Sequence, residues 1–376
     1  MTFMHKPTIR PESLGVSVAI CCQNSENLLP ATLSRLKKQQ AGDVKWEVLV
    51  IDNASIYQAA LVARDCWGED GPALMRVVHE PRLGVCYARE RAFAEAEYEL
   101  VSFIDDNNWV GPGWVATVSE CMSADPDVGA IGSVNTAVAD VPFPEWFHRY
   151  CQYYAAWAYR ELAAPRGLNG AGMTIRKTAW RELKREGFEP RLTGRVGSRL
   201  ARGEDLELGF ALQLRGYKIR IEPTLRLEHY ITPGRLQWSY LRRLLRSYGD
   251  ASVILDGYSL VSQSVQPKLV NRLGQCWWIR LGKEATQLLY SFSVVKLVKS
   301  RFRDMEGDDA VAAIDIHIGR LLALSQLRAS YGAFRRGLAD ASWRKPDHLL
   351  ESSTPTCSDT ADLKDVKALL KELSNS

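Results

Sequence analysis

The stretch YELVSFIDDNNWV, residues 98–110, decides the fold class. Its first eight residues are mainly apolar, aromatic or β-branched, so they predict a buried strand. Two acids and two amides, Asp105 to Asn108, follow this strand and precede a tryptophan. Asp and Asn also suit ordinary turns. Residues 105–108 could therefore form an ordinary solvated turn, and only other parts of the sequence can indicate a functional role for them.

Strands of the same character recur along the first third of the chain. They are VSVAICC (16–22), WEVLVID (46–52), MRVVHE (75–80) and VGAIGS (128–133). The stretches between them predict helices: Asn24 or Ser25 would cap ENLLPATLSRLKKQQ, and LGVCYARERAFAEAE has apolar spacings of three and four. This alternation indicates an α/β core with a parallel sheet covered on both faces. Ligands bind such sheets at the carboxyl ends of the strands, where Asp52 and Asp105 lie.

Composition narrows the class of protein. The eight cysteines form no C-x-x-C pair, which favours reduced thiols in a cytoplasmic protein. The first fifteen residues lack the apolar core of a signal peptide, and no run of 18 apolar residues predicts a membrane span. The residues after the first strand, CCQNSEN, lack the G-x-G-x-x-G of nicotinamide-dependent oxidoreductases. The net charge of +4 gives no reason to expect a nucleic-acid partner.

The second half begins with an aromatic block and a glycine-rich turn. A helix is predicted from near Glu204 to Gly216, followed by the strand YKIRIEP and then His229. Residues 235–303 carry twelve Lys or Arg against three acids, interleaved with Trp and Tyr. They suit either an anionic membrane surface or ordinary solvated helix faces. Residues 346–376 predict a linker and a short amphipathic helix.

Several of these motifs, in this order, resemble family 2 glycosyltransferases, which are inverting nucleotide-sugar enzymes of GT-A fold. The resemblance covers VSVAICCQNSENLLPATLSRLKKQQ, WEVLVIDNAS and RLGVCYARERAFAEAEYELVSFIDDNNWVGPGW, and later NGAGMTIRKTAW, GFEPRLTGR, GEDLELGFALQLRGYKI and LEHY. It implies a Rossmann-like mixed sheet with a helical extension. We expect a GT-A domain at 1–246, with a nucleotide-binding half at about 14–135 and an acceptor half at about 136–246. A basic helical extension would then follow at 247–345.

The resemblance also implies a metal site, because a nucleotide-sugar donor carries a diphosphate that a hard divalent cation with oxygen ligands holds. Asp105, Asp106 and Asn107 stand at the family's D-x-D position, and the expected cofactor is Mg²⁺ or Mn²⁺. Asn107 stands where many relatives have Asp. This leaves three alternatives: Asp106 takes over the contact with the metal, Asn107 binds the metal weakly, or the site uses less metal than is usual in the family. His229 matches a family histidine near the metal or diphosphate, although lone histidines are usually structural.

Further site residues follow from the same resemblance. Asp52 would bind the nucleobase, unless it only caps the next helix. Arg89 would lie near the nucleotide, unless it is a helix-surface residue, and Glu90 replaces the family's usual Asn. Small residues permit close approach of a ligand to the backbone. The remaining candidates are a floor for the sugar and acceptor at Gly170, Gly172 and Met173, and a phosphate-binding cluster at Arg235, Arg242, Arg243 and Arg246.

Glu204 and Asp205 match the family's E-D pair. Inverting transfer needs a base to take the proton of the acceptor hydroxyl, and we assign Asp205 to that role and Glu204 to orienting the acceptor. Acids in the first turn of a helix are also favoured electrostatically. The resulting prediction is a metal-assisted transfer of a sugar to a polysaccharide or lipid-linked acceptor. The enzyme would be cytoplasmic, or peripheral at the inner membrane face. The alternative is a non-catalytic member that binds a nucleotide sugar or glycan.

Overall fold

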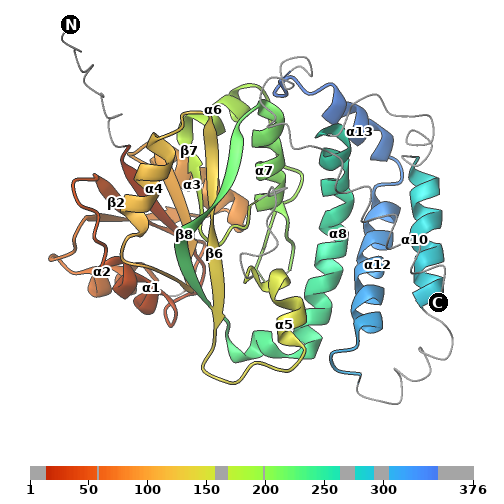
Figure 1. Cartoon of the computed structure of the whole chain (residues 1–376), viewed down its shortest axis with the longest axis horizontal. Helices are drawn as coiled ribbons and strands as arrows, with labels where there is room; N and C mark the ends of the chain where they lie inside the picture. Colours follow the sequence, from red (N-terminus) through yellow and green to blue (C-terminus); the bar gives the residue numbers. More distant parts are fainter. Residues whose placement is uncertain are drawn as a thin grey trace, which may run out of the picture.

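A computed structural model describes residues 14–56, 59–156, 168–197, 200–262, 276–291 and 305–345. Its described part contains a mixed sheet of eight strands in the order β3-β2-β1-β4-β7-β6-β8-β5 (Figure 1). The strands are β1 (Val16–Cys22), β2 (Trp46–Asn53), β3 (Leu74–Glu80), β4 (Leu100–Asp105), β5 (Asn108–Val110), β6 (Val128–Val138), β7 (Met173–Arg176) and β8 (Lys218–Tyr230). The first four are parallel to one another, whereas β7 runs antiparallel between β4 and β6. The expected mixed α/β sheet is confirmed.

Side chains alternate between the two faces of the sheet, as a strand requires. In β1, Val16, Val18 and Ile20 pack in one apolar cluster, and Ala19 packs in the other. The first cluster is covered by α1 (Leu29–Leu36), α2 (Ala59–Trp67) and α4 (Trp114–Ser123), the second by α3 (Val85–Glu95), α6 (Lys177–Arg185) and α7 (Glu204–Arg215). This two-faced burial explains why the strands are almost continuously apolar.

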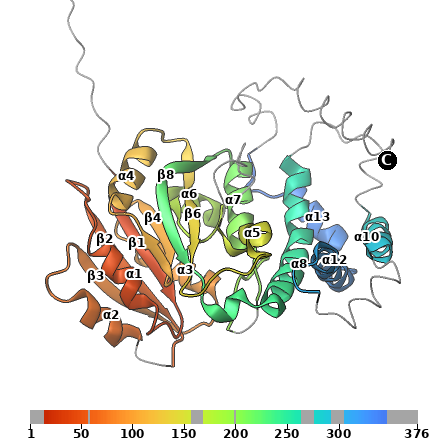
Figure 2. The same cartoon turned by 60° about the horizontal axis from the view of Figure 1, so that its bottom comes forward.

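A helical layer lies beside the sheet domain. Figures 1 and 2 show α8 next to the domain, with α12 and α10 further out. The elements of this region are α5 (Phe147–Tyr150), η1 (Cys151–Tyr154), η3 (Pro233–Leu236), α8 (Trp238–Ser262), α10 (Trp277–Ser291), α12 (Asp309–Gln326) and α13 (Tyr331–Ala339). Helix α8 runs unbroken through residue 246, where we expected a domain boundary. The linker and helix expected at 346–376 lie outside the described residues.

Two local expectations were wrong. Helix α1 begins at Leu29 without a side-chain cap, because the Ser25 hydroxyl donates to Asp106 instead of capping the helix. His229 lies within β8 and not after it, because this strand continues to Tyr230 along β5 and β6.

The basic segment 235–303 is partly neutralised within the protein. Arg242 and Arg246 of α8 donate to the two oxygens of Asp315 on α12, at 2.7 and 2.5 Å. Arg280 of α10 pairs with Asp256 of α8. Among the described residues no single helix is long and apolar enough to span a membrane, and only α12 and α13 together, bent by 89°, meet that length and composition.

Two glycines bring α8 and α12 into close contact. A Cβ added at Gly249 would overlap the carbonyl oxygen of Ile316, and one added at Gly319 would overlap that of Arg246. Each glycine therefore allows the backbone of the other helix to approach. The crossing fixes α8, which forms part of the cavity wall described below.

We predict that Gly249→Ala and Gly319→Ala each lower the free energy of unfolding by about 1–3 kcal/mol, the usual cost of overpacking. The overlap outweighs the gain of about 1 kcal/mol in helix propensity. Urea unfolding followed by circular dichroism measures the change. Gly282→Ala on α10 is the matched control, because nothing lies within 4 Å of its added Cβ. Variants at Gly249 and Gly319 as stable as this control would contradict the close crossing.

Candidate functional site

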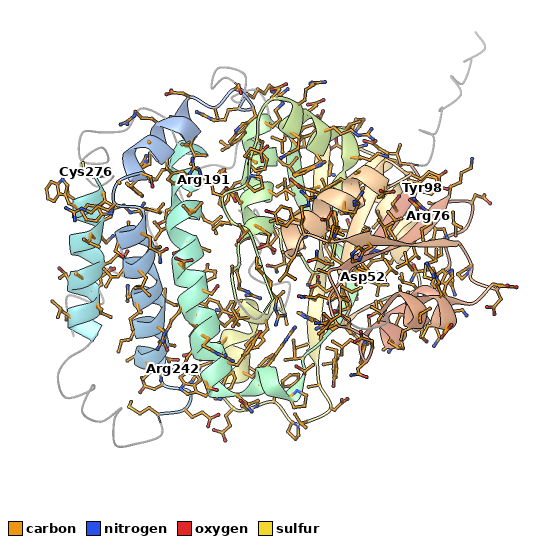
Figure 3. The ribbon with its side chains drawn as sticks, turned by 180° about the vertical axis from the view of Figure 1, so that it is seen from behind. Asp52, Arg76, Tyr98, Arg191, Arg242 and Cys276 are labelled. Carbon is orange, nitrogen blue, oxygen red and sulfur yellow. The ribbon has the colours of Figure 1, made fainter. Side chains whose placement is uncertain are left out.

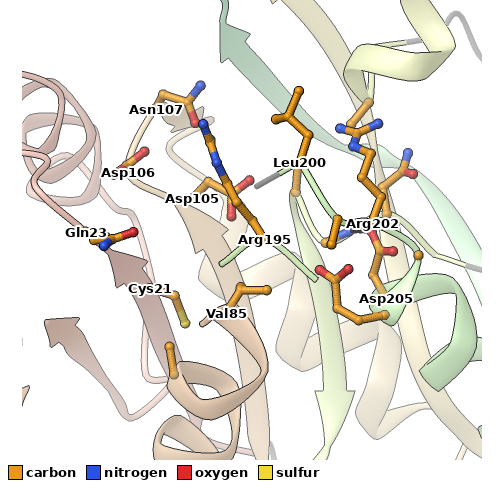
Figure 4. Close-up of a pocket in the computed structure, with 18 of the residues that line it drawn as sticks. Cys21, Gln23, Val85, Asp105, Asp106, Asn107, Arg195, Leu200, Arg202 and Asp205 are labelled. Atoms are coloured by element: carbon orange, nitrogen blue, oxygen red, sulfur yellow. Dashed lines mark hydrogen bonds between the residues drawn. The ribbon is translucent and has the colours of Figure 1, made fainter. Parts of the chain in front are cut away.

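A cavity of about 810 Å³ opens at the carboxyl ends of β1 and β4 (Figure 4). It is bounded by α3 and the start of α7 on the sheet domain and by α8 on the helical layer. The structure thus brings together chain segments more than 100 residues apart. The predicted site residues that line it are Arg89, Asp105, Asp106, Asn107, Gly170, Glu204, Asp205, His229 and Arg235.

Other predicted site residues do not line the cavity. Arg242 and Arg243 lie elsewhere on α8: Arg242 binds Asp315, and the Arg243 guanidinium lies over the ring of Tyr240. Figure 3 shows Arg242 far along the molecule from Asp52. The expected phosphate-binding cluster of four arginines is therefore wrong. Of its four members, Arg235 alone lines the cavity.

Gly172 and Met173 lie behind the cavity wall. Gly172 has φ +80°, and a Cβ there would overlap the hydroxyl of Ser133, so this glycine serves tight packing. Met173 is fully buried in β7. Of the expected floor only Gly170 faces the cavity, because β7 turns away into the sheet at Gly172.

Asp52 lies at the end of β2, next to the lining residue Asn53. Its Oδ2 is 3.6 Å from Nδ1 of His79, and its Oδ1 is buried without a hydrogen-bond partner among the described residues. A buried acceptor without a donor is costly. The free oxygen is therefore available for an N–H group that enters beside Asn53.

Two half-buried carboxylates lie at the carboxyl end of β4, Asp105 as its last residue and Asp106 directly after it. Burial raises the pKa of Asp105, and burial raises that of Asp106 to about 6, although the hydrogen bond from Ser25 opposes the shift. Asn107 is held against β8, because its Nδ2 donates to the carbonyl of Tyr230 at 2.6 Å. A cation bound at this edge of the sheet would stabilise the charged form of both acids and so oppose the effect of burial.

The E-D pair begins α7 on the opposite wall. Arg89 Nη1 lies 3.0 Å from Glu204 Oε1, and Asp205 Oδ2 accepts from the backbone N–H of Gly170 at 2.5 Å. Burial and the neighbouring Asp205 raise the pKa of Glu204 to about 7. A Cβ at Gly170 would overlap the Arg89 guanidinium, so glycine is required at this position.

His229 reaches the cavity from β8. Burial and the charge of Arg235 lower its pKa to about 3, so the imidazole is neutral at physiological pH. Neither ring nitrogen makes a hydrogen bond of good geometry to a described residue. A neutral imidazole with a free lone pair suits a metal or a hydrogen-bonding ligand.

Sequence reasoning missed part of the lining. Arg195 and Arg202 lie in the segment before the E-D pair, and Tyr153, Tyr240 and Tyr248 form an aromatic side. The rings of Tyr153 and Tyr248 meet edge to face with centroids 5.0 Å apart. Arginines next to an E-D motif were a usable signal. The tyrosines were not, because only the packing of η1 on α8 places them together.

Glu207 fixes the loop that carries Arg195. This fully buried carboxylate of α7 accepts from the backbone N–H groups of Arg191 at 3.0 Å and Leu192 at 2.8 Å, and from the hydroxyl of Tyr258 at 2.6 Å. The carbonyl of Arg195 then accepts from the N–H of Val85 at 3.1 Å. The loop is therefore tied to α7, α8 and the start of α3.

Comparison with known proteins agrees with this geometry. The sequence profile of Glycosyl transferase family 2 matches residues 17–182. No curated protein matches the sequence. A solved structure of the mannosyltransferase PcManGT from Pyrobaculum calidifontis, in complex with GDP-Man and Mn²⁺, superposes with a TM-score of 0.54 at 17% identity, covering 84% of this chain and 87% of that one. Residues 1–349 of S. aureus TarS give a TM-score of 0.44 at 14% identity, covering 86% and 92%.

The mixed sheet, with helices after the core, has the GT-A fold of that mannosyltransferase. Residues 17–182, somewhat less than half of the chain, match the model of glycosyl transferase family 2, which supports a glycosyltransferase domain over this range.

We predict that transfer depends on pH through the Glu204–Asp205 pair. Because the pKa of Glu204 is raised from 4.5 to about 7, the carboxylate that pairs with Arg89 forms only as pH rises through that value. The rate should therefore increase through an apparent pKa near 7, which belongs to the pair as a whole. A profile of nucleotide release against pH tests this. Glu204→Gln should lose this acidic limb, and an unchanged profile in that variant would contradict the assignment.

We predict that Glu207→Gln loosens the loop before Arg195. The amide nitrogen cannot accept from the two backbone donors, so the variant should lose about 1–3 kcal/mol of stability. Hydrogen exchange at Arg191 and Leu192 should become faster. Tyr258→Phe, which removes one donor and leaves the carboxylate, should cost less and leave these amides protected. Equal exchange in the wild type and Glu207→Gln would show that the carboxylate does not hold the loop.

Proposed function

We propose that the chain transfers a sugar from a nucleoside-diphosphate donor to a saccharide or lipid-linked acceptor with inversion, and that Asp205 is the base. The observation that carries this proposal is that two pairs of acidic side chains line one cavity. Asp105 and Asp106 lie at the carboxyl edge of the sheet, and Glu204 and Asp205 lie at the start of α7. An acceptor between them would have a base on one side and the donor on the other.

The hydrogen bonds of Asp205 support its role. Both of its oxygens accept from backbone N–H groups, Oδ2 from Gly170 and Oδ1 from Leu206. These bonds fix the orientation of the carboxylate. A base that takes a proton from an acceptor hydroxyl has to be ionised and correctly oriented before the reaction. Glu204 is paired with Arg89, and this leaves Asp205 as the better positioned acid.

The residues near Asp106 fit a divalent cation. The solved mannosyltransferase structure contains Mn²⁺ and GDP-Man. Here the Asp106 carboxylate, the Asn107 carbonyl and the unpaired His229 ring would hold the ion, which would stabilise charge on the departing diphosphate. No group of three His, Cys, Asp or Glu side chains forms a metal cage in the part of the chain that the structure describes. Phosphate oxygens of the donor would therefore have to complete the coordination.

The unpaired Oδ1 of Asp52 supports a nucleobase contact, because it offers a buried acceptor to a ring N–H. Two further statements rest on the sequence alone. The first is a cytoplasmic location, and the second is contact between residues 235–303 and an anionic membrane. Within that segment Arg242, Arg246 and Arg280 are already in ion pairs inside the protein.

We predict that Asp205→Asn lowers the turnover number by about 10²- to 10⁴-fold, the usual contribution of a general base. Asn keeps the size of the side chain and cannot accept the proton. The assay uses purified protein, a panel of nucleotide sugars with Mn²⁺ or Mg²⁺, and detection of nucleoside diphosphate release. Affinity for the donor, measured by calorimetry, should change little.

Glu120→Gln on α4 is the matched control, because Glu120 lies outside the cavity lining and is exposed. Turnover that survives in Asp205→Asn would contradict the base assignment. Donor binding without turnover in the wild type would favour the non-catalytic alternative.

A further inference from the structure

Besides Arg202, which donates to the carbonyl oxygen of Tyr153, the cavity contains two arginines for which the described residues provide no ion pair. Arg195 lies in the loop before α7 and Arg235 lies in η3. Among the described residues, neither guanidinium lies within 4.0 Å of a carboxylate oxygen, whereas Arg89 of the same cavity is paired with Glu204. Figure 4 shows the Arg195 side chain extending past Asp105 towards Asn107. Both arginines line the same cavity as Asp105, Asp106 and Asn107 at the D-x-D edge of the sheet.

The two arginines also repel each other. Burial lowers the pKa of Arg195, and the charge of Arg235 lowers it further. Two like charges held in a partly buried site are unfavourable unless an anion is bound between them. A diphosphate has several negative oxygens, and guanidinium groups bind such oxygens with two parallel hydrogen bonds.

The backbone of both residues is fixed. The Arg195 carbonyl accepts from Val85, and Gly194, with φ +64°, allows the loop to pass close to Val85 and Glu204. The Arg235 carbonyl accepts from the hydroxyl of Tyr154 at 2.9 Å. Binding an anion therefore orders only the two side chains, which keeps the entropic cost small.

We propose that Arg195 and Arg235 form a clamp for the diphosphate of the donor nucleotide, beside the metal position. This inference rests on the proposed function. As the acceptor oxygen bonds to the anomeric carbon, the bond from that carbon to the diphosphate breaks, the electron pair goes to the diphosphate, and the acceptor proton goes to Asp205. The two guanidinium groups stabilise the charge that builds up on the leaving oxygen.

The chemistry of Asn107 explains why this chain needs such a clamp. A neutral amide oxygen in the third D-x-D position attracts a divalent cation less strongly than a carboxylate does. Fixed arginine charges next to Asn107 offset that loss without requiring more metal affinity. Part of the diphosphate affinity should therefore persist when no metal is present.

Calorimetry on the full chain tests the clamp. The probes are nucleoside diphosphates of several bases, together with the nucleoside and monophosphate of whichever binds best, each in EDTA and in Mn²⁺. In EDTA, Arg195→Gln and Arg235→Gln should each weaken diphosphate binding by about 10- to 100-fold, the value of a charged hydrogen bond. Binding of the nucleoside should be unchanged. Arg195→Lys, which keeps the charge, should restore part of the affinity.

Arg185→Gln on α6 is the control, because this side chain is 73% exposed and lies outside the cavity lining. Thermal unfolding of all variants identifies any loss of fold, and Arg235→Gln provides an independent test if Arg195→Gln is unstable. An unchanged ratio of diphosphate to nucleoside affinity in both variants would overturn the clamp and leave the proposed function intact. No binding of any nucleotide by the wild type would overturn both.

A second probe tests whether the two arginines bind the diphosphate of the donor or that of a lipid-linked acceptor. Geranyl diphosphate carries the same diphosphate on a prenyl chain, as a lipid-linked acceptor does. If the clamp serves the donor, geranyl diphosphate should compete with the nucleoside diphosphate or fail to bind. Binding that depends on Arg195 and Arg235 but leaves nucleotide binding unaffected would assign the clamp to the acceptor and refute the proposal.

Discussion

The ion pair between Arg89 and Glu204 is the interaction on which the site depends. It joins α3 to α7, and both side chains are about nine-tenths buried, at 10% and 11% exposure. Without the guanidinium, Glu204 would be left buried beside Asp205 with no opposing charge, which is strongly destabilising for an ionised group. Gly170 follows from the same constraint, because any larger residue would occupy the place of the Arg89 guanidinium.

The helices after the core belong to the site as much as the sheet does. Helix α8 places Tyr240, Tyr248 and Leu255 on the cavity wall. The position of α8 depends on its glycine crossing with α12 and on the buried carboxylate of Asp315. A sugar ring has apolar C–H faces that pack on aromatic rings, so this wall is suited to an acceptor. Under the proposed function, the helical layer would shape the acceptor side of the cavity and the sheet edge would shape the donor side.

The sequence was informative where a residue's role depends on its place along one element. The strands, the extent of α7, the acids at the end of β4 and those at the start of α7 follow from local patterns, and the structure has them there. It was misleading where a side chain had two possible partners in space: Ser25 binds Asp106 and not the helix, and Arg242 binds Asp315 and not the cavity. The number of basic residues in a segment does not predict which face of its helices is exposed to solvent. Only the packing of α8 on α12 decided that.

The neutral side chain of Asn107 matters because, in the part of the chain that the structure describes, the acidic and basic side chains that line the cavity are equal in number. Within the described residues, the charged side chains that line the cavity are Asp105, Asp106, Glu204 and Asp205 against Arg89, Arg195, Arg202 and Arg235. An aspartate at residue 107 would give the acids the excess, and a diphosphate would then enter only with its cation. With asparagine the cavity is balanced, so the fixed arginines attract the diphosphate themselves. The amide therefore transfers part of the work of neutralising the leaving group from an exchangeable metal ion to side chains that the fold holds in place.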